Sequence, residues 1–86
     1  MEINDLINLI KKKIIQNIEV ENIIIEDKSF LHKKHKNFSK DKYHLKLSIT
    51  SKDLKLEGKL KANRIVYKIL DNEIKKYIHS IQVLIN

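Results

Sequence analysis

The spacing of apolar residues changes along this chain of 86 residues, and the order of the changes limits the fold more than any other feature. Apolar residues recur at helical spacing over residues 2–17, which predicts an amphipathic helix. β-Branched residues crowd residues 19–26, and apolar and polar residues alternate over residues 43–50, so we expect a strand in each range. A helical period returns over residues 60–76, and a third strand is expected at residues 78–85.

With a short helical turn after Ser51, these elements predict the order α-β-β-α-α-β. Ser51 and Asp53 are both residue types that cap helix N-termini. We expect the first two strands to pair antiparallel, and the third, which follows a helix, to pair parallel through a right-handed crossover. The predicted fold class is α/β (α+β): a single small domain over residues 1–86, with a three-stranded mixed sheet covered by helices in a KH-like (class II) topology.

The predicted core takes the apolar side chains that share one face of each element. A domain of this length buries roughly 60–65% of the surface of its unfolded chain, so the core should be modest and leaves no room for a large active-site cleft. The predicted core residues are Ile7, Ile10, Ile14, Leu45, Leu47, Ile49, Val66, Ile69, Leu70, Ile81 and Val83.

The residue types that this chain lacks exclude several kinds of function. It has no cysteine, which excludes disulfides, thiolate nucleophiles and metal sites built from cysteines. A single glycine, Gly58, excludes the phosphate-binding loops that need several glycines. No run of about 18 apolar residues is present, so we expect no membrane span. The first residues carry no apolar signal stretch, so we expect a cytoplasmic protein, with an organellar location left open.

Residues 27–42 show no periodicity and are mostly charged, which predicts a long basic loop between the first two strands. Of the net charge of +7, +5 lies in residues 28–42, which hold six lysines and one aspartate. Lysines bind phosphates by releasing counterions, but a single arginine and a single glycine oppose specific DNA readout and a KH-type Gly-x-x-Gly clamp. Any nucleic-acid binding should therefore be weak and non-specific. The candidate contacts for a partner or nucleic acid are Lys33, Lys34, Lys36 and Arg64.

Four histidines are the candidates for metal binding, because neutral imidazole is a common ligand. They are His32, His35, His44 and His79, and for each the alternative is an ordinary surface or helix-end residue. A structural zinc site is usually coordinated by about four ligands. Strand parity places His44 on the polar face of its strand, so we expect it to be only structural. Asp27, Ser29 and His32 form an Asp-x-Ser-x-x-His string, but catalytic triads are defined by spatial geometry, and we expect no enzymatic activity.

Several segments of the chain resemble BolA-like proteins. Residues 25–29, Ile-Glu-Asp-Lys-Ser, are followed by His32 and His35, and are similar to the Asp/Asn-x-Ser element that leads into a His- or Cys-bearing loop in that family. Residues 43–51 resemble the family's HF-x-V-x-I-V-S strand, with Leu45 in place of the aromatic residue.

The resemblance continues between Ser51 and His79 without a gap in its register. Residues 64–67 look like the end of the RHR-x-VY helix segment, Leu70 and Glu73 match L-x-x-E, and residues 78–81 match the terminal IHAL. The chain departs from the family at residues 54–58, where F-x-GK is expected, and in keeping only one residue of RHR. These segments surround the helical turn that the family links to nucleic-acid contact, so their loss weakens that function.

The resemblance implies a partner protein rather than a reaction. BolA-like proteins pair with monothiol glutaredoxins and can share a bridged 2Fe–2S cluster, which the glutaredoxin cysteine and glutathione hold on the other side. By the same resemblance, this chain offers His79, the strongest candidate, and either His32 or His35 as the loop ligand. Histidine can replace thiolate on one iron of such a cluster.

These features imply an adaptor in iron–sulfur cluster trafficking or assembly, monomeric alone and heterodimeric with glutaredoxin. The alternative is a KH-like nucleic-acid-binding or transcription-regulating protein that uses the basic loop.

Overall fold

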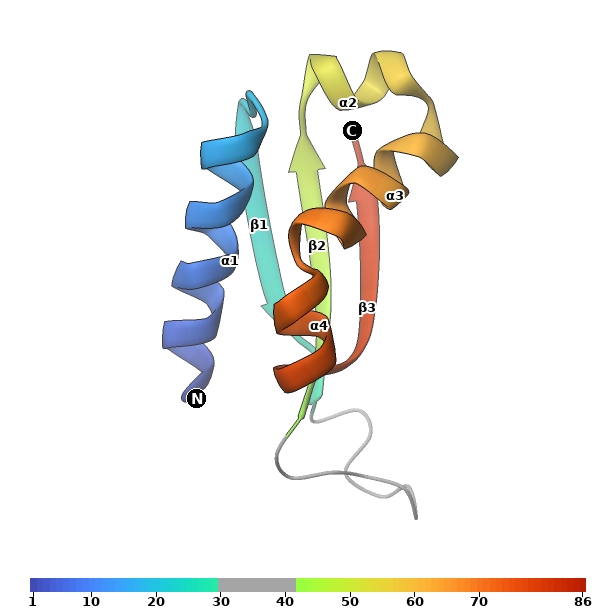
Figure 1. Ribbon diagram of the computed structural model, residues 1–86. Coiled ribbons are helices and arrows are strands. Elements are labelled where there is room, and N and C mark those ends of the chain that lie inside the picture. Colours follow the sequence, from blue (N-terminus) through green and yellow to red (C-terminus); the bar gives the residue numbers. More distant parts are fainter. Residues whose placement is uncertain (30–41) are drawn as a thin grey trace.

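The chain forms a three-stranded sheet whose helices pack on one face (Figure 1). A computed structural model describes residues 1–29 and 42–86. The predicted α+β class, mixed sheet and order of elements are confirmed there, with the long predicted helix divided in two. The elements are α1 (Ile3–Asn17), β1 (Asn22–Asp27), β2 (Tyr43–Thr50), α2 (Lys52–Glu57), α3 (Lys59–Ile69), α4 (Asp71–Tyr77) and β3 (Ile78–Ile85).

Strand β2 is the centre of the sheet. Its Leu47 pairs with Ile25 of β1 and with Val83 of β3. Strand β1 runs antiparallel and β3 parallel to β2, and these directions are as the sequence predicts. Alternation along β2 buries Leu45, Leu47 and Ile49 in the core. The two strand pairings bring the end of β1, the start of β2 and the start of β3 to the same end of the sheet (Figure 1).

Helix α1 packs its apolar stripe toward the core, as the helical period predicts. Leu6, Ile10 and Ile14 are fully buried, because residues four apart lie on one face of a helix. Ile7 was expected in this stripe, but it is only half-buried, and Leu6 takes its place. The two residues lie about 100° apart around the helix axis, so the rotation of the helix about that axis decides which of them enters the core.

The single helix predicted over residues 60–76 is wrong in one respect, because the chain bends at Leu70 between α3 and α4. The backbone of Leu70 lies at φ −97° and ψ 12°, outside the α-helical region. Its N–H still donates to the carbonyl oxygen of Val66, and its own carbonyl oxygen accepts from Ile74. The helical period of the apolar residues therefore continues through the bend, and the sequence pattern does not reveal the bend.

Two residues, Ser51 and Gly58, fix the start and the end of helix α2. Ser51 caps α2 as predicted, and its Oγ accepts from the N–H of Leu54 at 3.2 Å and donates to the carbonyl oxygen of Glu19 at 2.8 Å. Gly58 separates α2 from α3 at φ 85° and ψ 157°, a backbone conformation open mainly to glycine. The only glycine of the chain therefore stands where the backbone needs one.

The core agrees with the prediction along β2 and departs from it in the helices and in β3. Leu54, Ala62 and Ile78 are buried without having been predicted, while Ile69 and Ile81 are only half-buried. Ile81 lies on β3, which is an edge strand of the sheet that residues 1–29 and 42–86 form, and an edge strand is flanked by another strand on one side only. No helix in the described part of the chain is long and apolar enough to cross a membrane.

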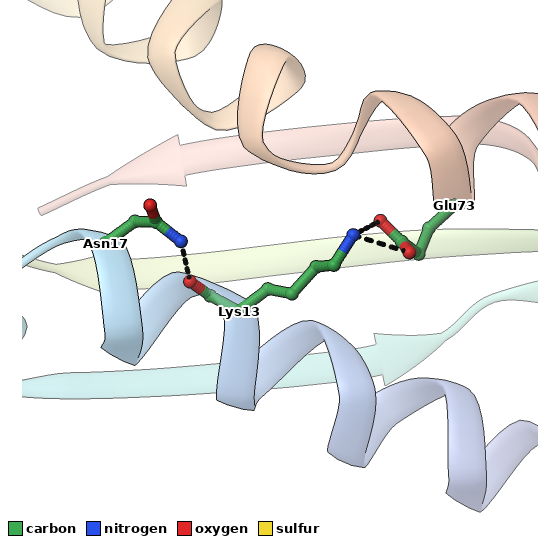
Figure 2. A network of polar contacts seen from close by, with 3 residues as sticks. All are labelled: Lys13, Asn17 and Glu73. Atoms are coloured by element: carbon green, nitrogen blue, oxygen red, sulfur yellow. Dashed lines mark hydrogen bonds and ion pairs between the residues drawn. The ribbon is translucent and has the colours of Figure 1, made fainter.

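An ion pair joins the first helix to the last one. The Nζ of Lys13 on α1 donates to both carboxylate oxygens of Glu73 on α4, each at 2.8 Å (Figure 2). The Glu73 side chain is only 3% exposed, and that of Lys13 is 33% exposed. The sequence motif that contains Glu73 thus has a structural use: it holds α4 against α1, just before the chain enters β3.

Candidate functional site

His79 lies at the junction of α4 and β3, where secondary structure fixes the backbone on both sides. Helix α4 ends at Tyr77, and the next residue, Ile78, is buried and begins β3. His79 follows directly and is exposed. An exposed imidazole on an anchored backbone is suited to meet a group carried by another molecule.

A register shift between β2 and β3 occurs at His79. Tyr43 pairs with Ile78, but the next residue of β2, His44, pairs with Ser80, which leaves His79 without a Cα partner. Extra residues of this kind form bulges, which re-aim side chains and are common beside functional sites. The centroid of the His79 ring lies 4.9 Å from that of His44, with the two ring planes tilted by 43°.

His44 is held in place by its backbone and by its ring. It is only 6% exposed, although strand parity places it on the face opposite Leu45 and Leu47. Its Nδ1 lies 2.6 Å from the Oγ of Ser80, and its N–H donates to the Oγ of Ser29 at 3.0 Å. Its carbonyl oxygen accepts from the N–H of Lys28 at 2.7 Å. His44 is therefore a buried residue, not a solvated one on a polar face.

Strand parity alone does not place His44 beside His79, and this contact is the part of the site that sequence reasoning missed. A signal was nevertheless present. Each histidine is the second residue of its strand, and the third strand was expected to pair in parallel with a neighbour, which proves to be β2. Aligned starts of two parallel strands bring such residues together.

Asp27 and Ser29 have a structural arrangement at the end of β1. The N–H of Ser29 donates to Oδ1 of Asp27 at 3.0 Å, which is the geometry of an Asx turn. The Oγ of Ser29 accepts the N–H of His44. The Asp-x-Ser string thus ties the end of β1 to the start of β2, with the serine accepting a backbone N–H.

Two hollows flank the histidine pair. One, of about 460 Å³, is mostly apolar, and its lining includes Tyr67, Ile74 and His79. The other, of about 430 Å³, has a mixed lining in which the charged and polar residues include Lys28, His44 and Lys46. The site therefore offers an apolar surface on one side of the pair and a basic surface on the other.

The charge of the basic hollow also acts on Glu26. Lys28 donates to its carboxylate at 2.7 Å, and this hydrogen bond lowers the pKa of Glu26 below its usual value. The positive charges of Lys28 and Lys46 lower that pKa further. Glu26 therefore stays ionised and compensates part of the lysine charge.

The structure describes only part of the predicted set of site residues. The residues that lie outside the described ranges are His32, His35, Lys33, Lys34 and Lys36. Arg64 is exposed on α3 and lines neither hollow beside His79. Within residues 1–29 and 42–86, no three His, Cys, Asp or Glu side chains converge as a metal site would require. A metal at His79 needs ligands from beyond this part of the chain.

Comparison with known proteins identifies the family to which the chain is similar. The model of the family described as BolA-like protein matches residues 14–85. Two solved structures, each with a TM-score of 0.77, share this fold over 92% of this chain and 87% of their own. They are BolA1 from Arabidopsis thaliana, at 26% sequence identity, and the BolA domain of SufE1 from Arabidopsis thaliana, at 23%. No curated protein matches the chain in sequence.

Proposed function

This chain belongs to the BolA-like protein family, and from that premise we propose that it is an adaptor that joins a monothiol glutaredoxin and co-ligates a bridged 2Fe–2S cluster. In this role it acts in iron–sulfur cluster trafficking or assembly and carries out no reaction of its own. The observation that carries the proposal is the placement of His79, exposed on an anchored backbone at a strand bulge.

The donor set of the chain fits one half of such a cluster. A 2Fe–2S cluster takes four ligands, and two histidines can replace two thiolates on one iron. The chain has no cysteine, so its ligands to iron would be imidazoles. His79 would supply one, and either His32 or His35 the other. The glutaredoxin cysteine and glutathione would hold the second iron.

The surfaces around His79 suit a partner of this kind. The apolar hollow offers area to bury against a protein, which is the main source of association free energy. Lys28 and Lys46 give this end of the sheet a positive charge. An anionic cluster with bound glutathione would be attracted to this charge.

The proposal is tested by mixing the protein with a holo-glutaredoxin and recording the visible absorbance. We expect the wild-type chain to change the spectrum, His79→Ala to abolish the change, and His32→Ala or His35→Ala to perturb it. Lys12→Ala, which alters an exposed side chain of α1 outside both hollows, is the matched control and should behave as wild type. A normal mixed-cluster spectrum with His79→Ala would contradict the proposal.

A second candidate function, nucleic-acid binding, is favoured by exposed cations on α2 and α3. These include Lys52, Lys55, Lys59, Arg64 and Lys68. Binding through such charges falls steeply as the salt concentration rises, whereas cluster ligation does not. DNA binding that is lost between about 50 and 200 mM salt, with no spectral response to holo-glutaredoxin, would favour this second function.

A further inference from the structure

The imidazole ring of His79 can act as a preorganised ligand only if a neighbouring group restricts its rotamers. Its backbone is anchored by Ile78, but its side chain is exposed, and an exposed side chain exchanges between rotamers. A ligand that has to be ordered on binding loses affinity, whereas one that is already ordered does not. The described residue whose ring meets the His79 ring is His44, at 4.9 Å between centroids.

His44 is itself fixed at three points. Its buried ring places Nδ1 2.6 Å from the Oγ of Ser80, which restricts rotation of the ring. Its N–H is bonded to Ser29 and its carbonyl oxygen to Lys28, so its backbone cannot shift readily. A side chain held in this way is a rigid support for a neighbour.

The contact between the two rings is of a kind that fixes orientation. A centroid distance of 4.9 Å with a tilt of 43° lies within the range in which aromatic rings pack, about 4.5–7 Å. The register shift of β3 leaves His79 without a partner across the strands, directly before Ser80. The bulge, the Ser80 hydrogen bond and the ring contact thus act on the same two imidazoles.

We propose that His44 is a positioning residue for His79: its ring, held by Ser80, keeps the His79 imidazole in one orientation, ready to bind a metal carried by a partner. The inference rests on the proposed function for the purpose it assigns, since a preorganised ligand matters only if His79 ligates. His44 acts by packing, and no ligand role is assigned to it.

The first experiment uses the free protein and needs no partner. Three-bond NMR couplings of the His79 side chain report whether it occupies one rotamer or averages over several. We expect one dominant rotamer in the wild type and in His44→Phe, which keeps a ring, and averaged couplings in His44→Ala. Ser80→Ala, which removes only the hydrogen bond, should give an intermediate result. Ser48→Ala, on the same face of β2, is the matched control and should match wild type.

The second experiment titrates holo-glutaredoxin with the same variants and reads the mixed-cluster absorbance. Losing the order of one side chain should raise the concentration for half-maximal change about two- to tenfold in His44→Ala. His44→Phe should stay within about twofold of wild type, because packing and not ligation is needed. Backbone amide spectra of each variant confirm that the fold is retained.

The outcomes separate the two proposals. If His44→Ala leaves the His79 couplings unchanged in a folded protein, the positioning role is wrong. If His44→Phe loses the mixed spectrum as fully as His79→Ala does, the His44 imidazole is itself a ligand, and the positioning role is again wrong. If the couplings follow the expected order but wild type gives no spectral change with glutaredoxin, positioning stands and the proposed function fails.

Discussion

Replacing Lys13 with methionine should destabilise the protein far more than its partly exposed position suggests. Methionine keeps most of the aliphatic stem but removes the ammonium group, so the Glu73 carboxylate loses two hydrogen bonds of 2.8 Å (Figure 2). Glu73 is 3% exposed and cannot gain water in exchange without local opening of the structure. An ionised carboxylate left alone in such a place is costly.

The magnitude follows from the burial of the two partners. Removing one partner of a fully buried ion pair costs about 3–5 kcal/mol. The Lys13 side chain is 33% exposed, so water already weakens this pair, and we expect a loss of about 2–3 kcal/mol. For a domain of this size that corresponds to a fall of about 8–24 °C in Tm. Thermal unfolding followed by circular dichroism measures it.

The control is Lys75→Met on α4. Lys75 pairs with Asp71 at 3.0 Å, but the two side chains are 73% and 62% exposed. Such pairs contribute about 0–1 kcal/mol, so the change should be small. In the double variant Lys13→Met with Glu73→Met, most of the stability should return, because no buried charge remains. Equal losses for Lys13→Met and Lys75→Met would refute the reasoning.

The strands were predictable because alternation with a period of two is a local signal. Residues 43–50 and 78–85 were expected as strands, and β2 and β3 have these bounds. Burial on one face forces apolar residues to every second position, so the pattern also predicts which residues of β2 enter the core. The parallel pairing of β3 followed from the helix before it.

The features that the sequence did not predict depend on contacts between segments that lie far apart in the sequence. The bend at Leu70 leaves the apolar period intact, so no local pattern marks it. The burial of Glu73 requires Lys13, which is 60 residues away, and no residue near Glu73 in the sequence indicates this partner. Likewise, the register shift at His79 is a property of how two strands meet. His79 was therefore predicted as the candidate ligand, but its contact with His44 was not.

Two further changes test the core and the junction between α2 and α3. Leu47→Ala should cost about 2–5 kcal/mol of unfolding free energy, measured by urea denaturation, because Leu47 is fully buried in the central strand. Gly58→Ala should cost about 1–3 kcal/mol, because residue 58 sits at φ 85° and ψ 157°, where a side chain strains the backbone. A Cβ added there meets no atom within 4 Å, so the loss reflects the backbone alone and not a clash. Gly58→Asn should therefore be destabilised too, although Asn tolerates positive φ better than Ala does. If Gly58→Ala unfolds at the same urea concentration as wild type, residue 58 does not hold this conformation in solution, and α2 and α3 meet in some other way.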